Sequence, residues 1–136
     1  MKQQRGLTLI ELMTVMAVVG ILAALVVPSY LDQGRRGRQA SAKSMLHEVL
    51  QHSERFYSEN NTFTDDMEDL GYGAGPTYFS ENGTHTITLA DGPSGDIATS
   101  VTITATPVAP DVTCDVLTLS SDMTRTASGT SPERCW

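Results

Sequence analysis

The N-terminal part of the chain contains an apolar run that is long enough to form a membrane-spanning helix. From Leu7 to Val27 the sequence LTLIELMTVMAVVGILAALVV has 21 residues, and its one charged residue is Glu11. As an α-helix this run is roughly 31 Å long, close to the ~30 Å hydrocarbon thickness of a bilayer. A carboxylate at that depth costs on the order of a few kcal/mol unless it is paired. Glu11 is therefore expected to have a specific function.

The charges of the 136-residue chain are distributed unevenly. Residues 56–136 contain 12 Asp and Glu residues against Arg125 and Arg134, whereas Arg35, Arg36, Arg38 and Lys43 lie together after the apolar run. An acidic domain repels nucleic-acid phosphates, so only this basic cluster could attract DNA. The simpler interpretation is a solvated helix face, and we expect no nucleic-acid partner.

Three kinds of N-terminal segment fit the apolar run to different degrees. A secretory signal peptide needs a small-residue cleavage site, which the ending LAALVVPSY does not supply. A plain membrane anchor fits the length, but the basic residues after Pro28 outnumber Lys2 and Arg5 and would place the following domain in the cytoplasm. The two cysteines and the acidic domain fit an oxidising exterior better.

The third possibility is a processed filament subunit. The residues RG followed by LTLIEL resemble the processing site of type IV prepilins, in which a short basic leader ends in Gly and the fifth mature residue is Glu. The resemblance implies a leader at residues 1–6, cleavage between Gly6 and Leu7, and methylation of the new Leu7 amine. Leu7 stands where the family usually has Phe.

The resemblance also assigns a function to Glu11. In the family this carboxylate is thought to attract the free amine of an incoming subunit and so to align that subunit in the filament. The alternative is that Glu11 only complements the positive end of the helix, which is worth about 0.3–1 kcal/mol. Gly20 and Pro28 weaken the helix between them, and related pilins unwind there when they pack into the filament.

The remaining sequence predicts an α+β fold with three parts: the leader 1–6, the transmembrane and filament-core segment 7–28, and the region 29–136. After Pro28, apolar residues recur at helical spacing, which predicts that the second half of a long helix packs on a sheet. Asn60 and Asn61 are expected to end that helix. The segments 84–90, 100–108 and 115–121 alternate with period two, and 123–127 adds a short fourth strand. The sheet is therefore expected to be antiparallel, with about four strands. The predicted buried face of the helix comprises Ala42, Met45, Leu46, Val49, Ser53, Phe56 and Tyr57.

Cys114 and Cys135 are the two cysteines of the chain and are separated by 20 residues. In an exported domain such a pair is expected to form a disulfide, worth about 3 kcal/mol for a loop of this size. The spacing also matches the C-terminal disulfide loop of type IV pilins. Trp136 is expected to pack beside the bridge.

No catalytic, cofactor or metal site is predicted, so we expect a protein that is not an enzyme. His47 and His52 lie five residues apart, which sets the two rings roughly 140° apart around a helix, so they do not share a metal. The acidic residues between Asp65 and Asp69 lack the EF-hand spacing and its central Gly, and they predict a solvated loop.

The resemblance to type IV pilins, and most of all to minor pilins of the PilE type, implies a structural subunit. Such a subunit would have its periplasmic domain held by a single inner-membrane helix before it enters the extracellular pilus. Its partners would be the prepilin peptidase, the inner-membrane assembly machinery and other pilin subunits, and its roles would be pilus assembly, twitching motility and adhesion. The alternatives are a type II secretion pseudopilin, a DNA-uptake minor pilin, a DNA-binding receptor that uses Arg35, Arg36 and Arg38, and an anchored domain without a filament.

Overall fold

The computed structural model describes residues 8–75 and 77–136 of the chain. These residues form one long helix, five strands and a short 3-10 helix. The chain divides into two compact units whose boundary lies between Arg36 and Gly37. The expected leader 1–6 and the cleavage site at Gly6 and Leu7 lie outside the described residues.

The long helix α1 (Leu9–Asn60) begins in the first unit, where it exposes its apolar side chains on every side. From Leu9 to Leu31 its large apolar side chains are between 53 % and 78 % exposed. Among the described residues, α1 is the one helix long and apolar enough to cross a membrane. A helix that is apolar all round needs lipid or other helices around it. Gly20 and Pro28 both lie inside α1, which is continuous at each, so local unwinding stays a prediction about the filament.

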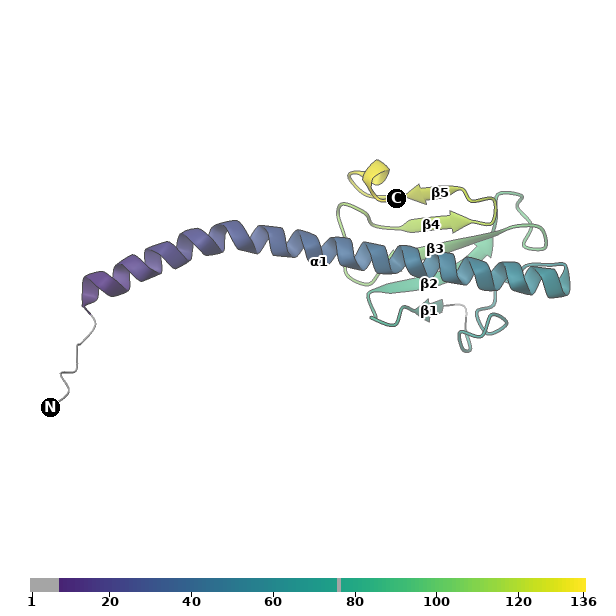
Figure 1. Ribbon diagram of the computed structural model, residues 1–136. Helices are drawn as coiled ribbons and strands as arrows, with labels where there is room; N and C mark the ends of the chain where they lie inside the picture. Colours follow the sequence, from purple (N-terminus) through teal and green to yellow (C-terminus); the bar gives the residue numbers. More distant parts are fainter. Residues whose placement is uncertain (1–7, 76) are drawn as a thin grey trace. The chain divides into compact units, whose positions relative to one another are not determined.

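In the second unit α1 lies across one face of the sheet, as predicted (Figure 1). The buried positions recur at helical spacing and include Leu50, which the predicted stripe omitted. Tyr57 was wrongly placed in that stripe, because it is 40 % exposed and its ring stacks on Phe63 at a centroid distance of 4.5 Å. The helix ends at Asn60, as predicted, and Asn61 follows with φ 57°, a left-handed conformation that Asn tolerates at a helix end. The buried residues on α1 are Ala42, Met45, Leu46, Val49, Leu50 and Ser53.

The sheet has five antiparallel strands in the order β1-β2-β3-β4-β5, each paired with its neighbour in the sequence. The predicted α+β class is confirmed, and the count of about four strands was one too low. The missed strand is β1, whose three residues are too few to show alternation. The strands are β1 (Thr77–Phe79), β2 (His85–Asp91), β3 (Val101–Pro107), β4 (Leu117–Ser120) and β5 (Arg125–Ala127).

The two faces of the sheet differ in chemistry because side chains alternate along each strand. The inward positions of β2, β3 and β4 are aliphatic and join the core beneath α1. The opposite face is hydroxylated, and one register row places a threonine on every strand. The core residues on these strands are Ile87, Leu89, Val101, Ile103, Ala105, Leu117 and Leu119, and the threonine row is Thr77, Thr88, Thr104, Thr118 and Thr126.

His85 is a buried titratable group at the start of β2, where it is 3 % exposed. Its Nδ1 atom shares a hydrogen bond of 3.1 Å with the Thr84 hydroxyl. Burial lowers the pKa of His85, the nearby Arg38 cation lowers it further, and the Asp111 carboxylate partly opposes both. The imidazole is therefore neutral in the folded domain at neutral pH.

This burial predicts a loss of stability as the pH falls below about 6.5. Below the ordinary histidine pKa near 6.5, the unfolded chain binds a proton that the folded domain resists, so protonation favours unfolding. As the pH drops below about 6.5, we expect the free energy of unfolding to fall by more in the natural protein than in His85→Gln. Urea unfolding at several pH values measures this difference. If the free energy of unfolding changes with pH in the same way in the two proteins, the prediction is wrong.

Candidate functional site

The N-terminal end of α1 holds the carboxylate that the sequence singled out. Thr8 precedes the helix, and its hydroxyl accepts a hydrogen bond of 3.3 Å from the Glu11 backbone N–H. The same hydroxyl lies 3.5 Å from Glu11 Oε2, to which it donates. The pattern Thr-x-x-Glu is that of a capping box, a local signal that the sequence analysis did not use. In the single subunit, Glu11 therefore takes part in the hydrogen bonds at the start of the helix.

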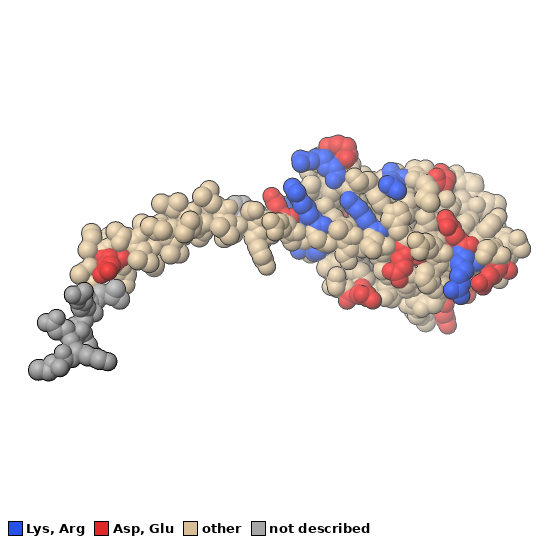
Figure 2. Space-filling model, in the orientation of Figure 1, with Lys and Arg blue, Asp and Glu red and all other residues tan. Residues whose placement is uncertain are grey.

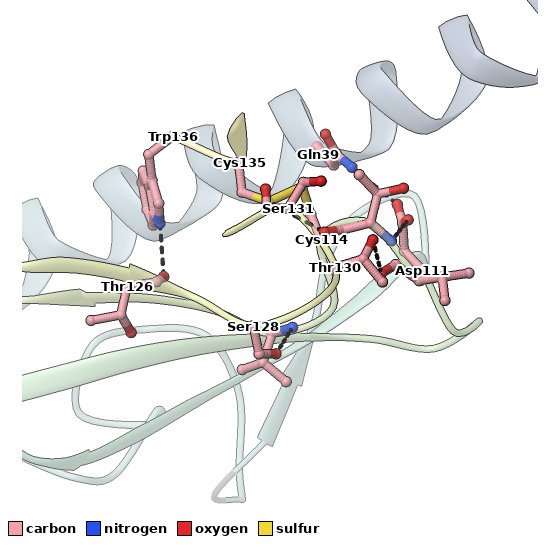
Figure 3. Close-up of a disulfide and its surroundings, with 12 residues drawn as sticks. Gln39, Asp111, Cys114, Thr126, Ser128, Thr130, Ser131, Cys135 and Trp136 are labelled. Carbon is pink, nitrogen blue, oxygen red and sulfur yellow. Dashed lines mark hydrogen bonds between the residues drawn. A yellow bond between two sulfur atoms is a disulfide. The ribbon is translucent and has the colours of Figure 1, made fainter. Parts of the chain in front are cut away.

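The disulfide between Cys114 and Cys135 is present, as predicted, with an S–S distance of 2.05 Å. Both cysteines belong to the buried core, at 3 % and 0 % exposure. The bridge fastens the last residues of the chain to the segment that leads into β4 (Figure 3). The tail is held further by the Thr130 backbone N–H, which donates to the Val112 carbonyl at 2.9 Å.

Trp136 packs against the core that contains the disulfide, as predicted, and it also has specific polar partners. Its indole N–H donates to the Thr126 carbonyl at 2.7 Å, a bond that Figure 3 shows directly. The Arg125 guanidinium lies 5.6 Å from the centroid of the indole, within the range of a cation–π contact. The His47 ring of α1 meets the indole edge-on at 6.4 Å. Trp136 thus joins α1, β5 and the C-terminal end.

Gly129 allows the tail to turn toward the disulfide. Its φ is +124°, and an added Cβ would overlap the Thr113 backbone carbonyl. We expect Gly129→Ala to lower the free energy of unfolding by about 2–4 kcal/mol, measured by urea unfolding under oxidising conditions. Gly95→Ala is the matched control, because Gly95 has φ +75° and open space around it. If Gly129→Ala lowers the free energy of unfolding no more than Gly95→Ala does, a steric role for Gly129 is contradicted.

The cations of the globular unit fall into paired and unpaired groups. Among the described residues the ion pairs are Arg35 with Asp32 at 3.8 Å and Arg55 with Glu59 at 3.3 Å. In residues 37–75 and 77–136 four cations therefore have no acidic partner within 4.0 Å. Figure 2 shows most of the visible Lys and Arg side chains toward one end of the domain, with acidic groups both beside them and over the rest of the visible face. The unpaired cations are Arg38, Lys43, Arg125 and Arg134.

Three of these unpaired cations belong to elements that meet at Trp136 or end beside it. Arg125 faces the indole, Arg134 lies in the 3-10 helix η1 (Pro132–Arg134) beside Cys135, and Lys43 is one helical turn from His47 on α1. We call these residues with Trp136 the Trp136 cluster: Lys43, His47, Arg125, Arg134 and Trp136. Cations beside an aromatic ring can hold phosphates and stack on bases.

The basic residues that the sequence offers as an alternative DNA site, Arg35, Arg36 and Arg38, are a different set. Arg35 pairs with Asp32, and Arg38 lies near His85 and Asp111 rather than beside Trp136. His47 is half-buried against Trp136. No local signal could have joined Lys43 to Arg125, since 81 residues separate them in the sequence.

The acidic loop after α1 forms its own hydrogen bonds. The Thr64 hydroxyl donates to Asp69 Oδ2 at 2.7 Å, and the Glu68 backbone N–H donates to Asp66 Oδ1 at 2.9 Å. Within residues 8–75 and 77–136, no group of three or more His, Cys, Asp or Glu residues is placed to hold a metal ion.

Comparison with known proteins identifies the family. Residues 1–27 match the prokaryotic N-terminal methylation motif, which implies processing by prepilin peptidase and assembly into a pilus. Residues 28–118, about two thirds of the chain, match the family described as type IV minor pilin ComP, DNA uptake sequence receptor. The two matches are adjacent and together extend from Met1 to Thr118.

Curated relatives are pilins from several bacteria. The type IV major pilin protein PilA of Myxococcus xanthus is 37 % identical over 70 residues, which are 52 % of this chain and 32 % of that protein. A fimbrial protein of Pseudomonas aeruginosa is 32 % identical over 109 residues, 76 % of this chain and 70 % of that protein. The type IV major pilin protein PilE1 of Neisseria gonorrhoeae is 45 % identical over 67 residues, 43 % of this chain and 39 % of that protein.

The match to PilA spans about a third of that protein, and the match to the wide-pilus component PilA4 of Thermus thermophilus spans about half of that one. The apolar helix, the antiparallel sheet and the C-terminal disulfide agree with these relationships. The chain is a type IV pilin, a structural rather than an enzymatic protein, and it belongs to the ComP family of type IV minor pilins.

Proposed function

We propose that this pilin is a minor subunit that binds DNA for uptake through the Trp136 cluster. The family that matches residues 28–118 is described as a DNA uptake sequence receptor, which supports the alternative of the sequence analysis over twitching motility and adhesion. The structural observation that carries the proposal is Arg125, a cation without an acidic partner within 4.0 Å, held over the Trp136 ring. Arg134 lies two residues before Trp136, and Lys43 lies one helical turn from His47, which contacts the ring. The proposal departs from our expectation that the chain has no nucleic-acid partner.

The cluster can contact DNA although the domain is acidic overall. Each cation that contacts a phosphate releases a condensed counterion. The resulting gain in binding free energy comes from that contact and not from the net charge of the domain. The acidic residues elsewhere repel the duplex and so restrict binding to the Trp136 cluster. The Arg125 guanidinium is held over the indole and is therefore presented in a defined position rather than as a freely rotating side chain.

Binding of DNA by the full chain in detergent micelles should depend steeply on salt. Three phosphate contacts predict that the affinity falls about 40-fold between about 50 and 200 mM salt. We expect Arg125→Ala to weaken binding about 10-fold, because it removes both a phosphate contact and the cation over Trp136. Fluorescence anisotropy with a short labelled duplex measures both effects.

The matched control for Arg125 is Arg55→Ala. Arg55 carries the same charge on α1 but is paired with Glu59. An equal loss of affinity in the two variants would mean that net charge, and not the Trp136 cluster, determines binding. No measurable binding at about 50 mM salt would overturn the proposed function.

We further propose that the subunit reaches the pilus by the route of its family. Cleavage after Gly6 would free the amine of Leu7 for methylation, and Glu11 would pair with the corresponding amine of a neighbouring subunit. The match of residues 1–27 to the methylation motif and the exposed apolar surface of α1 support this route. The globular domain would lie in the periplasm before assembly.

A further inference from the structure

A polar groove of about 150 Å³ lies between α1 and the β1–β2 hairpin of the globular domain, which run beside each other in Figure 1. The α1 wall includes Ser41, Ser44 and Glu48, at spacings that place them on one face of the helix. The hairpin wall includes Tyr78, Glu81 and Asn82. The Asn82 amide donates to the Ser41 hydroxyl at 3.5 Å, so the two walls also contact each other.

The groove is electronegative. It contains the carboxylates of Glu48 and Glu81, and no Lys or Arg is among the residues that line it. The Tyr72 hydroxyl donates to Glu48 Oε1 at 3.2 Å. Burial, and then the charge of Glu48, raise the pKa of Tyr72 well above its ordinary value, so this hydroxyl remains a donor. Glu48 is thus an exposed carboxylate, one oxygen of which is held by Tyr72.

We propose that this groove binds a hexosamine, a sugar that carries a free primary ammonium group. The ammonium would lie between the Glu48 and Glu81 carboxylates, where it neutralises their charge. The Ser41 and Ser44 hydroxyls and the Asn82 amide are both donors and acceptors, which suits the hydroxyl groups of a sugar. The Tyr78 ring offers an aromatic face to the apolar side of the pyranose or to the cation itself.

The size of the groove also favours a ring-sized ligand. One water occupies about 30 Å³ of the liquid, so the groove holds on the order of five waters, more than a single ammonium needs. A lysine side chain from a protein partner would satisfy the two carboxylates but would leave the serine and asparagine groups of both walls without new partners. A hexosamine uses both sets of groups.

Nuclear magnetic resonance titration of the isotope-labelled full chain in detergent micelles tests the proposal. We expect glucosamine to shift the signals of Ser44, Glu81 and Asn82 with a dissociation constant in the millimolar range, about 1–10 mM, as suits an open polar site. Glucose and N-acetylglucosamine lack the cation and should bind at least about 10-fold more weakly. Equal binding of all three sugars, or shifts at other residues, would overturn the proposal.

Variants and a second probe make the test specific. Glu81→Gln should weaken glucosamine binding about two- to fivefold, whereas Glu54→Gln, an exposed position on α1 outside the groove, should not. A lysine derivative blocked at its backbone amine and carboxyl groups mimics a protein partner. If it binds as tightly as glucosamine, the groove recognises a protein side chain and the proposal is wrong. The experiment contains no DNA, so its outcome is independent of the proposed DNA binding.

Discussion

Replacement of Glu11 by Ala should leave the protein in the inner membrane and remove it from sheared pili. The carboxylate lies in an apolar segment, where it gains most from an opposite charge on a neighbouring subunit. Without it, an incoming subunit has no anion to align its new N-terminal amine. We expect at least a 10-fold loss from the pilus fraction, measured by quantitative immunoblotting of sheared filaments against membranes.

The capping role of Glu11 must be separated from this assembly role. Thr8→Ala removes the hydroxyl that accepts the Glu11 backbone N–H and costs the helix end about 1 kcal/mol, but it leaves the carboxylate in place. We expect Thr8→Ala to enter pili at near-natural levels. If Thr8→Ala and Glu11→Ala are lost from the pilus fraction to the same extent, assembly requires the capping box and not the intersubunit charge.

Processing provides a second control for the Glu11 experiment. The intact mass of the membrane form shows whether the chain begins at a methylated Leu7. Glu11→Ala should be cleaved normally, because the proposed leader ends at Gly6. If Glu11→Ala is not cleaved, failed processing explains its absence from pili. If it is cleaved correctly and still enters pili at natural levels, the assembly role of Glu11 is wrong.

Removal of the disulfide is the second change with a large expected effect. The double variant Cys114→Ser and Cys135→Ser lacks the bridge, which restricts the conformations of the unfolded chain. For a loop of this size the expected cost is about 3 kcal/mol, or a fall in melting temperature on the order of 15 °C for a domain of this length. Circular dichroism melting of the oxidised protein and the variant measures the difference.

The position of the bridge adds a functional consequence. Cys135 precedes Trp136, so loss of the disulfide releases the indole that Arg125 faces. We therefore expect the double variant to bind DNA more weakly even below its melting temperature. Trp136→Phe keeps the bridge and an aromatic ring but removes the hydrogen bond to Thr126, so it serves as the control for ring placement alone. A double variant that melts within about 3 °C of the natural protein would contradict the stabilising role.

Several parts of the molecule could be predicted from the sequence because each depends on neighbouring residues. The apolar run predicts α1, because an apolar run of this length is typical of a membrane-spanning helix. The period-two segments predict β2, β3 and β4, because one face of each strand is buried. The pairing of Cys114 with Cys135 follows once the domain is taken as exported, because no other cysteine competes. The capping box of Thr8 and Glu11 is also local, and it could have been recognised.

Other features depend on contacts between distant residues. β1 has three residues and is a strand only because it pairs with β2. Tyr57 continues the helical spacing of the buried stripe, yet Phe63 provides its partner and leaves it exposed. Neither outcome can be read from periodicity, because both depend on where the chain returns after α1.

By itself the sequence determined the membrane-length helix with its single carboxylate, the α+β class and the disulfide, because these follow from hydrophobic period, charge and cysteine number. Only the tertiary structure decided which cations would share a surface. Lys43 and Arg125 have no relation along the chain. Folding places Arg125 over Trp136, and it places Lys43 one helical turn from His47, whose ring meets the same indole. A surface of this kind forms from residues that folding brings together, so no local pattern could predict it.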